Sequence, residues 1–226
     1  NFKNIDLLIK KKVDAIIADL GISGYQLLNS NRGFSFDEDS LLDMRINKHQ
    51  ELTAHKIVNS YNMQELSDII KNFGEEKNHF KIASEIVRQR HNEEIKTSLN
   101  LAKIIKKINK NKTKINASTR TFQALRIAVN DELSALIEFL EKSLGVLKTG
   151  GRLIIISFHS LEDRIVKQFF KYCEIKCVCP SSVMTCECKK EQTLRILTKK
   201  PLTPSKQEVL SNTRSRSAKM RIGVAL

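Results

Sequence analysis

Two short apolar runs bracket a long stretch of helical periodicity in this chain of 226 residues. The first run covers residues 13–19 and ends at Asp19, and the second covers residues 152–158. Runs of this length, bounded by glycines and polar residues, are typical of buried strands. Between them, residues 46–117 contain one glycine and no proline. The pattern predicts an α/β sheet whose chain is interrupted by an all-helical insert.

Helices are predicted wherever apolar residues recur at three- and four-residue spacing. Residues 51–108 predict four short amphipathic helices, the fourth capped by Thr97 or Ser98. Residues 121–147 predict one long helix that residues 148–151 stop. The remaining expected elements are a helix over 161–172 and strands over 193–198 and 218–224. The expected domains are a first core segment at 1–45, a helical insert at 46–117 and a second core segment at 118–226.

The charge indicates a polyanionic partner. The net charge is +14, from 39 Lys and Arg against 25 Asp and Glu. From Lys189 to the end there are ten Lys and Arg against two acids, and residues 46–117 carry 14 against eight. Two basic regions favour RNA or DNA as the partner, although a lysine-rich proteome would also raise the charge.

No membrane segment or secretory leader is expected. No apolar run approaches the roughly 20 residues of a membrane helix. The chain starts at Asn1 without a basic and then apolar leader, as though partway through a domain. We therefore expect a cytoplasmic protein that does not contact membranes.

All five cysteines fall within sixteen residues, as Cys173, Cys177, Cys179, Cys186 and Cys188. This clustering does not suit a disulfide framework for a whole secreted fold. Five thiols are enough for a tetrahedral metal site, but the C-x-C spacing is tighter than is usual for zinc. Metal binding and free thiols in an exposed hairpin remain alternatives.

Polar groups gather after both apolar runs, where ligands of α/β sheets bind. Asp19 is followed by Gly21, whose backbone can approach a ligand closely, although Asp19 can also simply cap a turn. His159 follows the second run and can act as a base or a nucleotide contact. Ser160 and Asp163 predict a capping box for the next helix.

Two further segments suit nucleic-acid contacts. Arg32, Phe34 and Phe36 place two aromatic rings beside a guanidinium, which can stack a base and hold a phosphate or merely anchor the loop. Arg120 lies near a predicted helix N-terminus, where a cation needs an anionic partner. That partner is a phosphate or Asp43. None of the eight glycines forms G-x-G-x-x-G or a P-loop.

Six segments occur in order along the chain: DLGISGYQL, RGFSF, LDMR, STRTFQALRIAVNDEL, LKTGGRLIIISFHSLEDRIVK and RSRSAKMRI. Together they resemble the MraW/RsmH family of bacterial methyltransferases, which modify cytosine N4 in small-subunit ribosomal RNA. The resemblance covers essentially the whole chain, and RGFSF and SFHSLEDRIVK are its most specific blocks.

The resemblance implies a Rossmann-like class I methyltransferase, here with a partial sheet, and an inserted all-α domain. It implies S-adenosyl-L-methionine as cofactor and one cytidine in the decoding region of the assembled small (30S) subunit as substrate. The family's Gly-Gly-His cofactor loop precedes the region present here, so this chain is expected to lack it. Family cofactor contacts map onto Phe2, Asp19 and Gln26.

Methyl transfer from a sulfonium depends mainly on positioning. We expect Asp19 to accept a hydrogen from the cytosine N4 amine and His159 to act beside it. The target base leaves its stack, with Phe34, Phe36 or Tyr25 as platforms. The full set of expected substrate contacts is Arg32, Phe34, Phe36, Arg120, Arg126 and Asn130. Two other functions remain open: a non-catalytic RNA-binding remnant of such an enzyme, and a related methyltransferase for an amine in DNA or protein.

Overall fold

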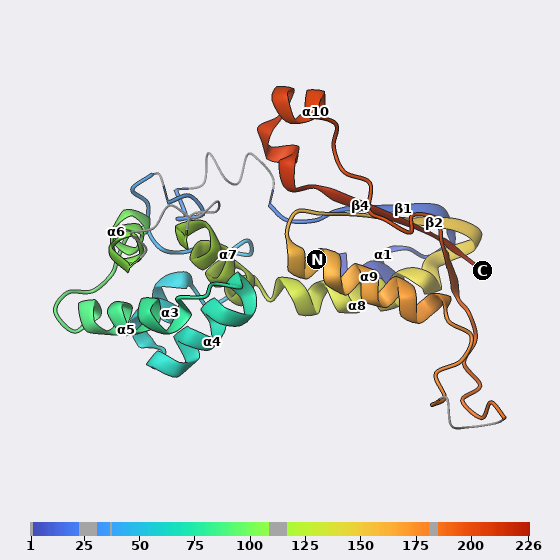
Figure 1. Cartoon of the computed structure of the whole chain (residues 1–226), viewed down its shortest axis with the longest axis horizontal. Helices are drawn as coiled ribbons and strands as arrows, with labels where there is room; N and C mark the ends of the chain where they lie inside the picture. The colour runs from blue at the N-terminus through green and yellow to red at the C-terminus, as the bar shows by residue number, and fades with distance from the viewer. Residues whose placement is uncertain (1, 23–30, 37, 109–116, 181–184) are drawn as a thin grey trace. The chain divides into compact units, whose positions relative to one another are not determined.

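The computed structural model describes residues 2–22, 31–36, 38–108, 117–180 and 185–226 (Figure 1). Its contacts divide the chain into two compact units, each with its own hydrophobic core. One unit joins residues 1–21 to residues 133–226, and the other is residues 22–132. The helical insert at 46–117 lies within the second unit. Its assignment as a separate domain, with the flanking segments 1–45 and 118–226, remains a prediction.

The first unit contains a four-stranded sheet of order β1-β2-β4-β3. Strands β1 and β2 are parallel, whereas β4 is antiparallel to both β2 and β3. The bounds are Val13–Asp19 for β1, Leu147–Ser157 for β2, Leu194–Ile196 for β3 and Lys219–Ala225 for β4. This mixed sheet confirms the α/β prediction, and the predicted span of β1 is correct. The prediction that β1 is buried is wrong, since Ile16 is its one buried residue and Ile17 is 67% exposed.

Two helices lie along the same face of this sheet, α8 (Glu132–Val146) and α9 (Ser160–Glu174) (Figure 1). Leu136 and Leu140 of α8 and Phe170 of α9 are buried with Leu153 and Ile155 of β2 in one core. The helices pack there because their apolar stripes match the alternating inward side chains of the strand. The short elements of this unit are η1 (Phe2–Asn4), α1 (Ile5–Leu8), α10 (Lys206–Ser211) and η2 (Thr213–Ser217).

The second unit is a group of helices around a separate core that includes Ile57, Leu66, Ile82 and Leu101, all fully buried. Its helices are α3 (Ala54–Ser60), α4 (Met63–Gly74), α5 (His79–Arg90), α6 (Ser98–Ile108) and α7 (Ala117–Asn130). The first four confirm the helical periodicity of residues 51–108. Thr97 caps α6, since its hydroxyl accepts the Asn100 N–H at 3.3 Å.

The prediction of one long helix over residues 121–147 is wrong, because this part of the chain forms two helices. Helix α7 ends at Asn130, α8 begins at Glu132, and Asp131 between them has a φ of +49°. A left-handed residue ends the helical hydrogen-bond ladder, and Asp is one of the few side chains that tolerate it. Periodicity cannot detect the break, since the apolar stripe continues past it.

The predicted helix end before residues 148–151 is confirmed, since α8 ends at Val146, but residues 148–151 are not a turn. These residues belong to β2, which begins at Leu147, and the register against β1 shifts between Val13 and Ala15 to accommodate them. A bulge of this kind admits extra residues without ending the strand.

No helix in the described part of the chain is long and apolar enough to cross a membrane.

Candidate functional site

The carboxyl end of β1 carries the first predicted site residue. Asp19 is exposed there, opposite Ile156 of β2. The chain leaves the strand through Leu20, whose N–H donates to the Ile156 carbonyl at 3.0 Å. Gly21 follows with a φ of +96°, a conformation that glycine adopts without strain. Because no described side chain pairs with the Asp19 carboxylate, its oxygens are accessible to a ligand.

The other two predicted cofactor contacts differ from Asp19. Phe2 lies in η1 with 44% of its surface exposed. Its ring meets Phe139 of α8 edge-on, with centroids 5.2 Å apart at an angle of 78°. One face of an aromatic ring is thus anchored while the rest is open to solvent. Gln26 and Tyr25 lie outside the described residues.

The capping box of α9 is one residue earlier than predicted. His159, not Ser160, caps the helix, and its Nδ1 accepts the Glu162 N–H at 3.4 Å. The Glu162 carboxylate accepts the N–H groups of Phe158 at 2.9 Å and His159 at 3.3 Å. The backbone of His159 is extended whereas Ser160 is already helical, so the imidazole occupies the capping position.

This capping role limits how His159 can take part in catalysis. Its side chain is only 9% exposed, and Nε2 lies 3.2 Å from Glu162 Oε1 without the geometry of a hydrogen bond. With Nδ1 engaged in the cap, only Nε2 remains for proton transfer or a nucleotide contact. The catalytic assignment of His159 remains a prediction.

The shifted cap leaves Asp163 for a different role, which sequence reasoning missed. Its Oδ1 accepts Arg221 Nε at 2.6 Å, and its Oδ2 accepts Lys219 Nζ at 3.2 Å. Burial opposes the charged carboxylate, but the two cations outweigh it and lower the pKa of Asp163. The pair joins α9 to β4 beside the carboxyl end of β2 and is nearly inaccessible, with side chains 12% and 8% exposed.

The RGFSF segment packs into the core of the helical unit. Phe34 is buried, and Phe36 is half-buried with its ring edge-on to Phe122, centroids 5.6 Å apart. Arg32 donates from Nη1 to the Arg45 carbonyl at 2.6 Å, and its guanidinium lies 5.4 Å from the Phe34 centroid. This packing favours the loop-anchor alternative for Phe34, because a base could stack on that ring only after the loop opened.

Arg120 and Asp43 each have a different partner from the one predicted. Arg120 pairs with buried Glu76, Nη1 to Oε2 at 3.4 Å, and not with Asp43. Asp43 instead accepts Arg45 Nε at 2.7 Å and Nη2 at 2.9 Å. Arg45 lowers the pKa of Asp43, mainly through these side-chain hydrogen bonds. The partner of Asp43 is two residues away along the chain, whereas the partner of Arg120 is forty-four residues away.

The last two predicted substrate contacts are bound within the helical unit. Arg126 makes a two-pronged ion pair with Glu132, both distances being 2.8 Å. Asn130 Nδ2 donates to the carbonyls of Met44 at 2.8 Å and Arg126 at 2.9 Å, while its Oδ1 accepts the Ile46 N–H at 2.7 Å. Asn130 therefore holds the loop around Met44 against the end of α7.

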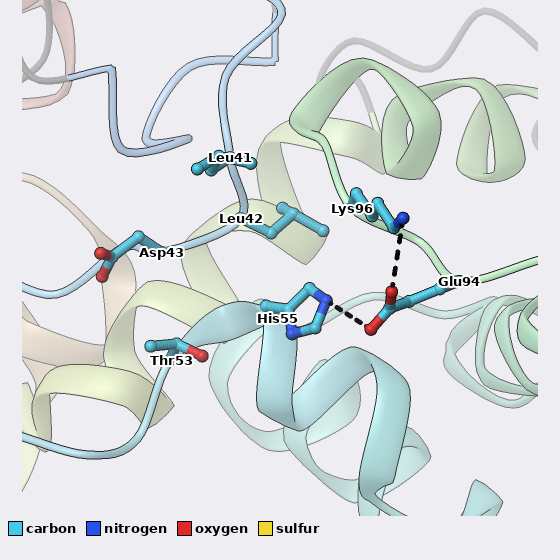
Figure 2. Close-up of a pocket in the computed structure, with 7 residues that line it drawn as sticks. All are labelled: Leu41, Leu42, Asp43, Thr53, His55, Glu94 and Lys96. Carbon is cyan, nitrogen blue, oxygen red and sulfur yellow. Dashed lines mark ion pairs between the residues drawn. The ribbon is translucent and has the colours of Figure 1, made fainter.

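An open pocket of about 410 Å³ lies beside that loop (Figure 2). His55 Nε2 lies 3.0 Å from Glu94 Oε1, and Lys96 Nζ lies 3.7 Å from Glu94 Oε2. Leu41, Leu42, Asp43 and Thr53 complete the lining. No sequence pattern pointed to this pocket, because its residues come from three separate parts of the chain.

The basic C-terminal region is exposed where it can meet a polyanion. Lys206 in α10 and Arg214 and Arg216 in η2 are all exposed, and α10 and η2 contact one another. Leu210, on the same short helix, is 85% exposed. Exposed cations such as these on α10 and η2 are accessible to the phosphates of a nucleic acid.

Comparisons with known proteins agree on one family. The sequence profile of the MraW methylase family matches residues 1–224. The chain is 49% identical over 223 residues to the ribosomal RNA small subunit methyltransferase H of Caldicellulosiruptor saccharolyticus, covering 98% of this chain and 71% of that protein. It is 50% identical over 228 residues to the protein of the same name from Clostridium botulinum strain Kyoto, covering 98% and 74%. The corresponding protein of Clostridioides difficile is 43% identical over 229 residues, again with 98% and 74% covered.

Proposed function

This chain belongs to the MraW methylase family, and from this membership we propose that it methylates small-subunit ribosomal RNA using S-adenosyl-L-methionine. The finer proposal is that the methyl group goes to N4 of a cytidine in the decoding region. The observation that carries the proposal is the profile match over residues 1–224, since it spans both units of this class I methyltransferase fold.

The described residues suit part of a nucleoside-containing cofactor. Asp19 offers an exposed carboxylate at the carboxyl end of β1, and Gly21 lets the backbone come close. Phe2 offers an exposed ring. These groups match the hydroxyl or amine and the adenine of S-adenosyl-L-methionine, so we propose Phe2 and Asp19, together with Gln26, as its contacts. The bound cofactor supplies an electrophilic methyl group on a sulfonium sulfur.

Asp19 is also the proposed catalytic residue. The N4 lone pair of cytosine is delocalised into the ring, which makes the amine a weak nucleophile. A carboxylate that accepts an N4 hydrogen holds the amine in line and favours localisation of the lone pair. Its effect is mainly positional, as expected for methyl transfer. His159 is proposed to contact the cytidine through Nε2, the ring nitrogen that the helix cap does not use. This atom is buried in the structure, so the contact requires the side chain to become accessible when the substrate binds.

The basic residues are proposed to grip the ribosomal RNA. Exposed Lys206, Arg214 and Arg216 contact phosphates without giving up an ion pair to any residue that the structure describes. Arg32 and Arg120 are half-buried with internal partners and would contribute positioning more than affinity. Each released counterion makes binding weaker as salt rises. A steep salt dependence of small-subunit binding is therefore expected.

A methylation assay with matched acidic variants tests the role of Asp19. Asp19→Ala should lower kcat/KM by roughly a hundredfold or more, in the range seen for loss of one transition-state contact. Asp14→Ala is the control, because Asp14 lies on the same strand and pairs with Lys148 on the surface, at 2.9 Å. The readout is N4-methylcytidine in small subunits from cells lacking this modification. Equal activity of Asp19→Ala and Asp14→Ala would remove Asp19 from the mechanism.

Calorimetric titration of S-adenosyl-L-methionine separates the enzyme from a non-catalytic RNA-binding protein. Saturable one-to-one binding to the purified chain, weakened in Asp19→Ala, supports the enzyme. A folded chain that binds small subunits but no cofactor supports the RNA-binding alternative.

A further inference from the structure

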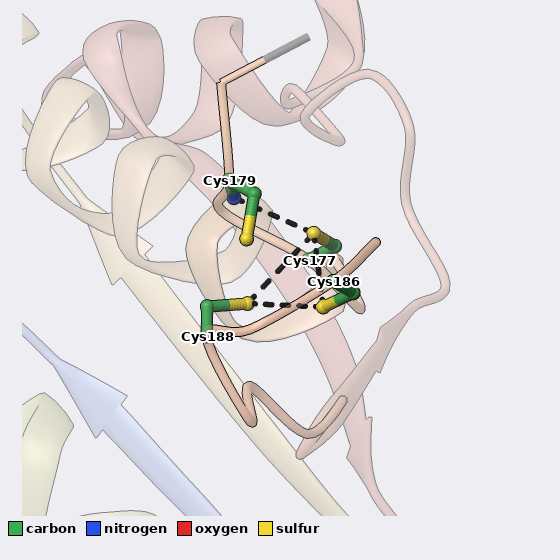
Figure 3. A group of neighbouring side chains, drawn as sticks. All are labelled: Cys177, Cys179, Cys186 and Cys188. Carbon is green, nitrogen blue, oxygen red and sulfur yellow. Dashed lines mark hydrogen bonds between the residues drawn. The ribbon is translucent and has the colours of Figure 1, made fainter. Parts of the chain in front are cut away.

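Four cysteines form a compact cluster in the connection between α9 and β3 (Figure 3). They come from two C-x-C pairs, Cys177 with Cys179 and Cys186 with Cys188. All four Sγ atoms lie within 4.8 Å of one another. Cys186 Sγ is 3.4 Å from Cys177 Sγ and 3.5 Å from Cys188 Sγ, and Cys177 and Cys188 are 3.7 Å apart.

These spacings fit a tetrahedral metal site and not a disulfide. A zinc ion bonds thiolate sulfur at about 2.3 Å, so the sulfurs of a tetrahedral site lie about 3.8 Å apart. A disulfide requires about 2.05 Å between sulfurs. All five cysteines are free thiols. Four sulfurs at near-tetrahedral separations leave room for one ion among them.

Backbone amides support thiolate ligands in this cluster. The Val178 N–H donates to Cys188 Sγ at 3.4 Å, and the Cys179 N–H donates to Cys177 Sγ at 3.4 Å. Hydrogen bonds of this kind orient a sulfur ligand toward its metal. Each C-x-C pair thus has one sulfur that receives a backbone N–H.

Packing alone does not account for this arrangement. Cys177 and Cys186 are exposed, and so is the apolar side chain of Val178. No helix or strand is present in the described residues between Glu174 and Leu194. A short surface segment without a core usually needs a metal or a disulfide to become ordered. Neighbouring Lys176 and Lys189 are exposed cations that would offset the excess negative charge of four thiolates.

The fifth cysteine is separate. Cys173 lies in α9 and is buried in the core of the sheet unit, 4% exposed. Burial raises the pKa of its thiol, which disfavours a thiolate ligand. The structure therefore divides the five cysteines into one core residue and four candidate ligands, a division that the sequence leaves open.

We propose that Cys177, Cys179, Cys186 and Cys188 bind one Zn²⁺ ion as a closed, all-thiolate site. Four protein ligands leave no open coordination position, so the ion is structural and not catalytic. Its role is to fix the connection between α9 and β3. The proposal is independent of the proposed methyltransferase function, because the site holds no group assigned to cofactor or RNA.

Metal analysis of the purified chain tests this proposal. The native chain and Cys173→Ala should each contain one zinc per chain, whereas Cys177→Ser and Cys186→Ser should lose most of it. Reconstitution of the metal-free native chain with Co²⁺ should give the intense visible absorption of a tetrahedral thiolate complex. That absorption should be absent from the double variant Cys177→Ser/Cys186→Ser.

Thiol alkylation of the native chain provides a second readout that does not depend on a variant folding. Removing the metal with a chelator should make four further thiols reactive, and added Zn²⁺ should protect them again. Failure of Zn²⁺ to protect any thiol, together with no Co²⁺ spectrum, would overturn the proposal. An iron–sulfur chromophore in place of zinc would overturn the choice of metal.

Discussion

The Asp163–Arg221 pair should make a large contribution to the stability of the sheet unit. Its Nε to Oδ1 distance is 2.6 Å, and both side chains are almost fully buried. Asp163→Ala would leave the Arg221 guanidinium buried without its partner. Breaking a buried pair in this way costs about 3–5 kcal/mol, because the remaining charge stays desolvated.

The surface pair Asp14–Lys148 gives the matched control. It is equally well formed at 2.9 Å, but the side chains are 85% and 52% exposed. Exposed pairs contribute about 0–1 kcal/mol, so Asp14→Ala should change the free energy of unfolding by no more than that. Urea denaturation followed by circular dichroism measures both variants, with the midpoint compared at an unchanged slope.

The double variant Asp163→Leu/Arg221→Met tests the reasoning itself. Replacing both buried charges by apolar side chains should recover most of the loss, since no buried charge is left unpaired and Lys219, the other partner of Asp163, is 39% exposed. A cost of Asp163→Ala as small as that of Asp14→Ala would refute the argument. The argument would also be refuted if the loss of unfolding free energy in the double variant equalled the sum of the losses in Asp163→Leu and Arg221→Met.

The same pair makes stability depend on pH. The folded pKa of Asp163 is lowered, so its contribution is fully present above the unfolded value, about 3.9. It is lost as the pH falls through the lower folded pKa. The free energy of unfolding of Asp163→Asn, measured by urea denaturation, should therefore change less with pH in that range than that of the native chain.

Three other predictions concern the helical unit and RNA binding. Gly74→Ala should destabilise the fold, because a Cβ there would lie 2.7 Å from the Arg120 carbonyl oxygen. Gly145→Ala should instead stabilise α8 by up to about 1 kcal/mol, because a Cβ at that position would meet no atom within 4 Å. Thermal melts of the two variants distinguish these effects. Asn130→Ala should cost about 1–3 kcal/mol through its lost hydrogen bonds, and hydrogen exchange should increase at the Ile46 amide, which would not occur if the loop were held otherwise. Arg214→Ala should reduce the slope of small-subunit affinity against salt, and an unchanged slope would exclude a phosphate contact there.

Local sequence patterns were sufficient for the elements that form from their own periodicity. The span of strand β1 follows from a short apolar run, and the helices α3 to α6 follow from the helical spacing of apolar residues. The six segments, in their order along the chain, were also enough to identify the family resemblance, which the profile match over residues 1–224 confirmed. Composition indicated the polyanionic partner, which remains a proposal.

Only the tertiary structure decided which polar side chains are already paired. The sequence places Arg120, Ser160 and Asp163 near predicted helix starts and offers Asp43 as one partner for Arg120. Each of these side chains has several possible partners. Glu76, forty-four residues from Arg120, takes that cation, and Arg221 takes Asp163 from another strand. Such choices depend on distances across the fold, which no local periodicity contains.

The cysteines show the same division between sequence and structure. The sequence determined that five thiols lie close together along the chain, and hence that a metal site was conceivable. Which four sulfurs meet was decided by α9, which buries Cys173 in the core, and by the tertiary fold, which places the four other Sγ atoms within 4.8 Å of one another. The physical reason is that side-chain proximity depends on how the backbone folds back on itself, whereas sequence spacing fixes only the length of chain between residues.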